Sequence, residues 1–499
     1  MIINMETRRE FLKKSGAMAL ATCSILLRSV VSDEAGPVGL TKRRNILFFF
    51  PDQHRFDWLG TNPKLPLRTP NLDALCRRGA RFTNALTPSP LCAPARACLA
   101  AGKEYDRCRV AGNGQDYPLD QTTFYTLLRE SGYHVAGCGK FDLHKASPTW
   151  GLDGKHLLAE WGFSDGIDNA GKTDAISSGV KEPKDPYMAY LKGKGLLEIH
   201  VADFRKRGGY KGTFPTPLPE EAYCDNWVAN NGLELMKRFP AGKPWFLQIN
   251  FTGPHSPLDI TKRMDAICRG RDFPQPNRST QYTPEIHNAI RQNYSAMVEN
   301  TDRWLGVYIE KLKGRGELDN TLIVWSSDHG EMLGDHDQWG KSLPYQPSVG
   351  VPLVVAGPDV RGGFVSGALV STIDLAATFL EVGGVERPND MDSLSAKALL
   401  EGKKDTHREY LLSGLGQWRL VFDGRYKLIR GFGGGKRVGK KKGKGGQEPK
   451  PVAAPMLFDL QNDPLENVNI ADKVPREVAR LSRILDALIH KQARFRREY

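Results

Sequence analysis

The 499-residue sequence lacks several features that would place it in a specialised class of protein. After the first 35 residues no apolar run is long enough to cross a bilayer, so we expect no stable membrane insertion once a signal is removed. None of the eight cysteines stands in a Cys-x-x-Cys pair, which argues against a zinc knuckle. No internal repeat is evident. With 40% hydrophobic and 25% charged residues, the chain has the composition of a soluble globular protein, long enough for two domains.

The net charge of +13 would suit a nucleic-acid partner, but much of it is local. Residues 433–446 carry six positive charges and no negative one, and glycine supplies nearly all of the rest. Such a segment cannot bury enough apolar surface to fold alone, so we expect residues 433–450 to form a basic Gly/Lys-rich loop. We expect no nucleic-acid partner. The alternative is a basic flap that attracts a polyanionic polymer.

The first residues have the pattern of an export signal. Arg8 and Arg9 precede Phe11-Leu12-Lys13-Lys14, and a weakly apolar stretch follows from Ala17 to Val31. This pattern predicts a twin-arginine signal over residues 1–36, with a periplasmic or otherwise exported location. No clean cleavage site stands out before Gly36. A basic arm on a cytosolic protein is the alternative.

Strand-like and helix-like segments alternate along most of the chain. Continuous apolar runs, typical of strands covered on both faces, occur at residues 45–50, 134–138, 245–251, 321–326 and 351–355. Helical patterns lie between them at residues 122–131, 223–238, 287–314 and 371–382. This alternation predicts an α/β fold with a doubly wound, mostly parallel sheet and helices on both faces, over residues 42–404. Ligands of such sheets bind beyond the carboxyl ends of the strands.

The character of the sequence changes after about residue 405. Residues 418–430 have the pattern of a hairpin that turns at Asp423-Gly424. A further strand is expected at residues 456–460 and a final helix at about 475–496. We therefore expect a small C-terminal subdomain over residues 405–499, with an antiparallel sheet and a packed helix.

The most specific motif is Cys92-Ala93-Pro94-Ala95-Arg96, followed by a helical pattern to Lys103. A nucleophile at a helix start gains from unpaired backbone N–H groups, which favour a developing anion. Arg96 could hold an anionic group from the same end of the helix. The alternative is a buried structural cysteine beside a surface arginine. The motif resembles the signature of the type I sulfatases, in the alkaline phosphatase superfamily. The resemblance implies that a maturase converts Cys92 to formylglycine, whose hydrate is the nucleophile.

Residues after two of the predicted strands match the metal ligands of that family. Asp52 and Gln53 follow the first strand, and Asp328 and His329 follow the strand at 321–326. With Cys92 as formylglycine, the resemblance implies one divalent metal ion, for which we expect Ca²⁺, with Mn²⁺ or Mg²⁺ as alternatives. Gln53 and His329 make the ligand set less anionic than the common one. In this the chain is similar to branches near the choline sulfatases and the phosphonate monoester hydrolases.

The remaining catalytic groups are also assigned by resemblance. Lys140, in Gly139-Lys140-Phe141, and Lys341, in Trp339-Gly340-Lys341, would contact the sulfate oxygens. His255, in Gly253-Pro254-His255, would protonate the leaving oxygen. The family's histidine after the first lysine is missing. Asp142 takes its place and His144 follows two residues later, so either could act as a base, or both could be structural.

These residues predict a metal-dependent sulfuric ester hydrolase that releases sulfate from a sulfate monoester, by two-step covalent catalysis through formylglycine. The substrate is expected to be a sulfated small molecule or polysaccharide, with a carbohydrate sulfate as the first choice. A phosphonate or phosphodiester hydrolase of the same superfamily is one alternative. An inactive polyanion-binding relative is the other.

Overall fold

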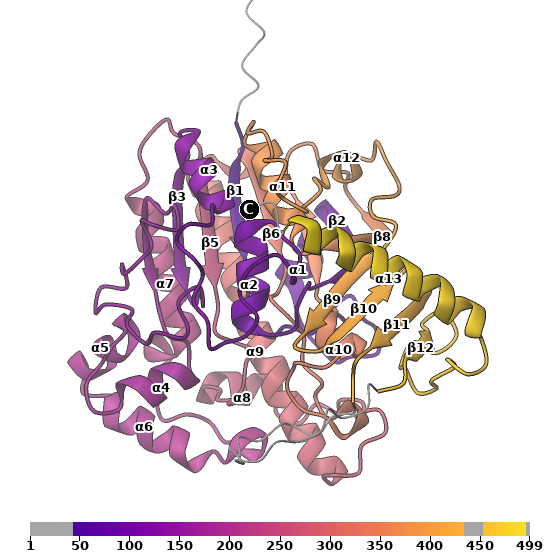
Figure 1. Ribbon diagram of the computed structural model, residues 1–499. Helices are drawn as coiled ribbons and strands as arrows, with labels where there is room; N and C mark the ends of the chain where they lie inside the picture. The colour runs from indigo at the N-terminus through magenta and orange to yellow at the C-terminus, as the bar shows by residue number, and fades with distance from the viewer. Residues whose placement is uncertain (1–42, 434–452, 496–499) are drawn as a thin grey trace, which may run out of the picture. The chain divides into compact units, whose positions relative to one another are not determined.

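The computed structural model describes residues 43–433 and 453–495 (Figure 1). The expected export signal at 1–36 lies outside these residues, as does nearly all of the expected basic loop at 433–450. No helix among the described residues is both long and apolar enough to cross a membrane. The seven cysteines of the described part of the chain form no disulfide, and six of them are buried.

The larger sheet has eight strands in the order β4-β3-β5-β1-β6-β7-β2-β8. All neighbouring pairs are parallel except those of β7, which runs antiparallel to β6 and β2. The mostly parallel sheet predicted from the sequence is therefore confirmed. The strands are β1 Asn45–Phe49, β2 Ala80–Leu86, β3 His134–Gly139, β4 Asp165–Asp168, β5 Trp245–Asn250, β6 Thr321–Trp325, β7 Leu353–Ala356 and β8 Phe364–Ser371.

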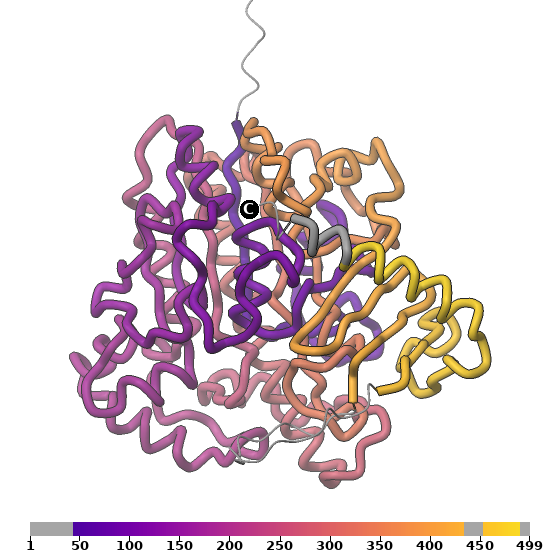
Figure 2. The backbone as a smooth tube through the Cα atoms, viewed as in Figure 1, coloured from indigo at the N-terminus to yellow at the C-terminus, as the bar shows by residue number. Residues whose placement is uncertain are grey.

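Both faces of this sheet are buried, as the continuous apolar runs indicate. In β1, Ile46 and Phe48 belong to one hydrophobic cluster, whereas Leu47 and Phe49 belong to another. Because successive strand residues point to opposite faces, a strand buried on both faces must be apolar throughout. Figure 2 shows the N-terminal β1 segment in the interior of the fold, between β5 and β6 from later in the chain.

Helices cover each face. The cluster with Ile46 includes residues of α2 (Cys92–Ala101), α3 (Phe124–Glu130) and α11 (Asp374–Val382). The cluster with Leu47 includes residues of α1 (Pro70–Arg78), α7 (Cys224–Lys237) and α9 (Pro284–Gly314). Shorter helices complete the fold: α4 Thr173–Gly179, α5 Pro186–Gly193, α6 Leu197–Lys206, α8 Lys262–Cys268, α10 Gln346–Val349 and α12 Lys397–Leu400.

A separate four-stranded antiparallel sheet follows, in the order β12-β11-β10-β9. Its strands are β9 Leu411–Leu415, β10 Trp418–Phe422, β11 Tyr426–Arg430 and β12 Met456–Asp459. The helix α13 (Pro475–Phe495) lies across it in Figure 1 and buries Leu481 and Leu485 against β10 and β11. The hairpin turns at Asp423-Gly424 as expected, and Gly424 has a φ of 96°, which favours glycine.

Candidate active site

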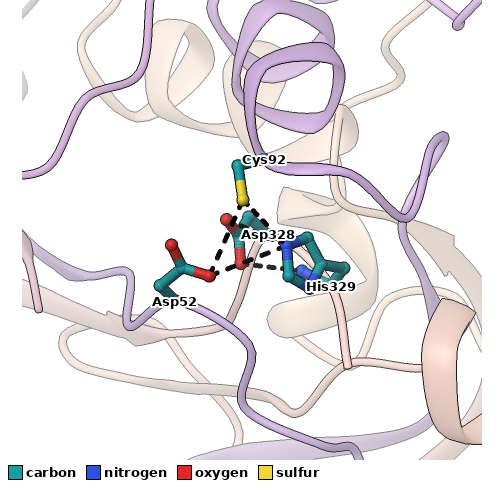
Figure 3. A group of neighbouring side chains, drawn as sticks. All are labelled: Asp52, Cys92, Asp328 and His329. Carbon is teal, nitrogen blue, oxygen red and sulfur yellow. Dashed lines mark hydrogen bonds and ion pairs between the residues drawn. The ribbon is translucent and has the colours of Figure 1, made fainter. Parts of the chain in front are cut away.

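The polar residues expected at the strand ends meet at one edge of the large sheet. Asp52 follows β1, Asp328 and His329 follow β6, and Lys140 follows β3 directly. Cys92 is the first residue of α2, so its side chain lies where the first N–H groups of the helix lack intrahelical partners. Figure 3 shows its sulfur directed at Asp52, Asp328 and His329.

These four side chains form a compact ligand cluster. One ligand atom from each lies within 4.8 Å of all the others, and all four residues are buried. The Cys92 Sγ is 3.3 Å from His329 Nε2 and 4.0 Å from Asp52 Oδ1. Two buried carboxylates this close repel each other unless positive charge lies between them. The donor set therefore fits a divalent cation, with carboxylate oxygens suited to hard ions and the imidazole to Mn²⁺ as well.

The His329 ring is oriented for this role. Its Nδ1 lies 3.0 Å from the carbonyl oxygen of Gly330, which can only accept, so Nδ1 carries the proton. The Nε2 atom, which faces the cluster, is then the nitrogen that can offer a lone pair to a cation. A backbone carbonyl that fixes the tautomer of a histidine in this way is common at metal sites.

Gln53 is directed at the same place by several contacts. Its φ of 71° lies in the left-handed region, a strained conformation for glutamine that the surroundings must hold. Its backbone N–H donates to Asp328 Oδ1 at 3.0 Å, and its carbonyl accepts from the Tyr294 hydroxyl at 2.6 Å. Its Oε1 accepts from the Lys341 Nζ at 2.9 Å, and that ammonium is also 2.9 Å from the Cys92 sulfur.

Sequence reasoning missed the residue that orients the Gln53 amide. Glu331, which is fully buried, accepts from Gln53 Nε2 and, at 2.8 Å, from the Tyr210 hydroxyl. Its other oxygen accepts the backbone N–H groups of Leu333 at 2.9 Å and Gly340 at 2.6 Å. Because Gly340 precedes Lys341, one carboxylate fixes both Gln53 and the Lys341 segment. The sequence does not indicate that Glu331 has this orienting role, and its only signal is its place two residues after His329.

Arg96 contacts the ligands rather than open space. Its Nε donates to Asp328 Oδ2 at 3.0 Å, and its Nη2 is 3.9 Å from Asp52 Oδ2. It also donates to the Lys140 carbonyl at 2.6 Å. In this structure Arg96 therefore holds the two carboxylates and the chain at Lys140 in place.

Positive charge controls the ionisation of the cluster. Burial favours neutral Asp52, but Lys140 and Lys341 oppose this and hold the pKa of Asp52 well below its usual range. Burial and Asp52 would raise the pKa of the Cys92 thiol, yet the same two lysines bring it well below its ordinary value. The site is therefore built to stabilise a negative charge at position 92.

A cavity of about 160 Å³ opens at the Cys92 side chain. Lys140, Lys341 and His255 line it, together with two lysines that sequence reasoning did not consider, Lys145 and Lys172. The His255 Nδ1 contacts the Ser256 carbonyl oxygen, so Nδ1 carries a proton and Nε2 is the nitrogen available for exchange. The nine predicted site residues, with Cys92 in both the catalytic and the ligand set, thus lie in one region of the fold.

The structure separates the two residues that could replace the missing histidine. Asp142 is buried, and its Oδ2 contacts Lys140 at 3.1 Å and Lys145 at 2.8 Å. Burial raises the pKa of Asp142, but the two lysines outweigh burial and lower it, so Asp142 is anionic. His144 faces away: its Nε2 is 2.6 Å from the Thr149 carbonyl oxygen, and it lines no part of the cavity.

The sequence of this chain matches that of a known enzyme family. The model of the sulfatase family matches residues 44–385, more than half of the chain. The chain belongs to the sulfatase family. This confirms the resemblance of the Cys92 motif.

Individual sulfatase relatives have low sequence identity to this chain, but the matches extend over most of each chain. The chain is 28% identical over 395 residues to an arylsulfatase of Clostridium perfringens, covering 74% of this chain and 80% of that one. It is 26% identical over 408 residues to an N-acetylglucosamine-6-O-sulfatase of Bacteroides thetaiotaomicron, covering 74% and 73%.

Solved structures share the same fold. The phosphonate monoester hydrolase of Agrobacterium radiobacter matches with a TM-score of 0.74 and 22% identity, over 90% of this chain and 96% of that one. A protein in complex with its substrate D-glucosamine-2-N,6-O-disulfate matches with a TM-score of 0.70 and 20% identity, over 90% and 98%. At these identities the likeness shows the fold alone, so the chemistry must be argued from this sulfatase's own residues.

Proposed function

We propose that this sulfatase releases inorganic sulfate from a sulfated carbohydrate, using a divalent metal ion and a formylglycine made from Cys92. The observation that carries the proposal is the position of Cys92, at the start of α2 and within one ligand cluster with Asp52, Asp328 and His329. An inert buried cysteine would need no such neighbours. The Lys341 ammonium in contact with its sulfur supplies the charge that an anionic nucleophile requires.

The metal ion would be held by Asp52, Asp328, His329 and the Gln53 Oε1, with the modified side chain at position 92. We propose Ca²⁺, with Mn²⁺ or Mg²⁺ as the alternatives that the imidazole ligand admits. Bound there, the ion would supply Lewis-acid stabilisation of negative oxygen, and the hydrated aldehyde would supply the nucleophilic hydroxyl. Arg96 contacts both carboxylates and reduces the repulsion between them.

Three side chains of the cavity would act on the ester itself. Lys140 and Lys341 neutralise charge on the sulfuryl oxygens, which is the main electrostatic demand of attack on an anion. His255, protonated at Nε2, would donate to the leaving oxygen as the ester bond breaks. His144 takes no part, since its ring bonds to Thr149 outside the cavity.

The lining of the cavity favours a hydrophilic leaving group. Besides the catalytic residues it consists of short or charged side chains, such as Asn113, Thr173, Asp174 and Thr252, and no Phe, Tyr or Trp is among the described lining residues. A choline group prefers an aromatic cage and would be repelled by four lysines. A sugar, with hydroxyls that both donate and accept, suits this surface. The relative named as an N-acetylglucosamine-6-O-sulfatase agrees with that choice.

The competing function is hydrolysis of a phosphonate monoester or phosphodiester with the same nucleophile. It is favoured by the less anionic ligand set with Gln53 and His329. An inactive polyanion-binding relative is the third candidate. The convergence of charged groups around Cys92 speaks against it, because a surface that only binds would not bury them.

The test combines chemistry at position 92 with substrate choice. Protein co-produced with a formylglycine-forming maturase should show exchange of sulfur for oxygen in the peptide that contains Cys92, by mass spectrometry, and should hydrolyse 4-nitrophenyl sulfate. Cys92→Ala should lower kcat at least about 10³-fold without loss of fold, because a nucleophile is removed. Cys76→Ala, on α1 and only half-buried, is the matched control and should keep activity.

Three outcomes would contradict the proposal. An unmodified thiol at position 92 in active protein would exclude the nucleophile. Activity retained by Cys92→Ala would exclude the site. A higher kcat/KM on a 4-nitrophenyl phosphonate ester than on the sulfate would favour the phosphonate function.

We further propose export by the twin-arginine route, on the basis of Arg8 and Arg9. This route carries folded proteins, so the maturase could modify Cys92 in the cytosol before export. The maturase and the sulfated substrate are the partners that this proposal requires.

A further inference from the structure

The catalytic cavity adjoins a second, larger one. A neighbouring cavity of about 330 Å³ shares Lys145 and Asp174 with it. This volume falls in the range of small-molecule sites, about 300–1,000 Å³. We call the second cavity the Lys184 groove. Its walls are residues 145–150, from the segment after β3, and residues 174–184, from α4 and the segment after it.

An ion pair lies where the two cavities meet. The Lys145 Nζ contacts Asp142 Oδ2 at 2.8 Å and Asp174 Oδ2 at 2.5 Å. The Lys145 side chain is buried, whereas that of Asp174 is 36% exposed. Lys145 is therefore neutralised by carboxylates on both sides, and Asp174 keeps one face open to the groove.

The charge of Lys184 is not neutralised. It is exposed, lines the groove, and its ammonium has no hydrogen bond or ion pair with any of the residues described at 43–433 and 453–495. Beside it, the hydroxyls of Ser177 and Ser178 donate to the Asp174 carbonyl at 3.1 and 2.7 Å, which leaves their lone pairs as acceptors. The groove thus offers one free cation, one carboxylate and two hydroxyls, which suits a polyhydroxylated ligand with a negative group.

We propose that the Lys184 groove binds the sugar unit next to the one that carries the scissile sulfate, and that this unit bears a second anionic group, a sulfate or a carboxylate, held by Lys184. Asp174 and the two serine hydroxyls would bind its ring hydroxyls. The inference rests on the proposed carbohydrate function and extends it to an oligosaccharide substrate. Because the two cavities share Lys145 and Asp174, they adjoin, which suits two linked sugar units.

The test measures binding rather than turnover. Three disaccharides serve as probes: a sulfated one with a uronic acid, its unsulfated carboxylate form, and a neutral one. Each is titrated by calorimetry into full-length wild type, Lys184→Gln and Lys181→Gln, all in the Cys92→Ala background. Lys181 is an exposed lysine three residues away that lines neither cavity, so it is the matched control.

Lys184→Gln should lower the affinity for the two anionic disaccharides about three- to tenfold, as expected for one partly exposed charge-assisted contact. The affinity for the neutral disaccharide should not change. Weakened binding of both anionic probes identifies the carboxylate, which both carry, as the group that Lys184 holds. Weakened binding of the sulfated probe alone identifies the sulfate. Four results would each overturn the proposal. The affinity for all three probes could fall equally, or for none of them. Lys181→Gln could have the same effect as Lys184→Gln, or the protein with Lys184 could show no measurable binding. Hydrolysis of 4-nitrophenyl sulfate by protein that retains Cys92 tests the proposed function separately.

Discussion

Glu331→Gln is the substitution whose consequences the structure defines most closely. Four donors converge on this buried carboxylate: the amide of Gln53, the hydroxyl of Tyr210, and the backbone N–H groups of Leu333 and Gly340. Glutamine keeps one acceptor oxygen and gains two N–H donors. Because backbone groups cannot turn, the oxygen must remain on Leu333 and Gly340, and the new NH₂ group then faces Gln53 and Tyr210.

The side chain of Gln53 loses its hydrogen-bond acceptor in this variant. The Tyr210 hydroxyl can rotate and accept, but the Gln53 NH₂ group meets another NH₂ group. If the Gln53 amide flips, its NH₂ group faces the Lys341 ammonium and its Oε1 leaves the ligand cluster. One unsatisfied buried donor costs about 1–3 kcal/mol. Loss of a supporting contact to a ligand lowers metal affinity about 10- to 100-fold.

Two assays measure these effects. Urea unfolding followed by tryptophan fluorescence, in the presence of a chelator, gives the change in the free energy of unfolding. Calorimetric titration with Ca²⁺ and Mn²⁺ gives the affinity. Glu310→Gln on α9 is the control. Its side chain is 69% exposed, and among the described residues it pairs only with Lys313. We therefore expect the free energy of unfolding to change by less than about 0.5 kcal/mol and the metal affinity to stay the same. Equal behaviour of the two variants in both assays would refute this account of Glu331.

Two further predictions concern stability away from the site. Lys427→Met should lower the free energy of unfolding by about 3–5 kcal/mol, because it leaves the fully buried Glu466 carboxylate without its cation. The double variant Lys427→Met with Glu466→Leu should recover stability. An unchanged urea midpoint in the single variant would disprove the prediction. Asp374 is the second case. Burial opposes its ionisation, but Arg408 and His407 lower its pKa to about 2. Its folded pKa is thus below the unfolded value, so its stabilisation of about 2 kcal/mol is present above about pH 4 and is lost as pH falls toward 2. The stability advantage of wild type over Asp374→Asn should shrink over that range in thermal unfolding, and a constant difference would contradict it.

The main strands could be predicted because burial on both faces requires an unbroken apolar run. Residues 45–50, 134–138, 245–251 and 321–326 each contain such a run, and each is a strand. The predicted strand at 351–355 begins two residues later, after Pro352, which lacks a backbone donor. Strands β2, β4 and β8 were not predicted. Thr83 is exposed in β2, β4 has only four residues with an aspartate at each end, and the first half of β8 is partly exposed. In all three strands the apolar pattern is too short or too interrupted.

The residues around Cys92 could be predicted because they occur in local motifs. Residues of the cavities that lie outside such motifs could not be predicted. Lys145 and Lys184 belong to no motif, and only the packing of residues 145–150 against residues 174–184 brings them to one groove. Neither did the sequence decide between Asp142 and His144. A φ of 53° at Asp142 turns the chain, so that Asp142 faces Lys140 while the His144 ring packs near Trp150 and Trp161.

The sequence by itself therefore determined the layered α/β architecture, the place of Cys92 at a helix start and the residue types of the ligand cluster. Each depends on short-range order: hydrophobic periodicity, a helix start, or a residue directly after a strand. The tertiary structure decided which charges neutralise each other and which remain free. Because charge compensation depends on distances of a few ångströms between residues far apart in the chain, only the folded arrangement fixes it.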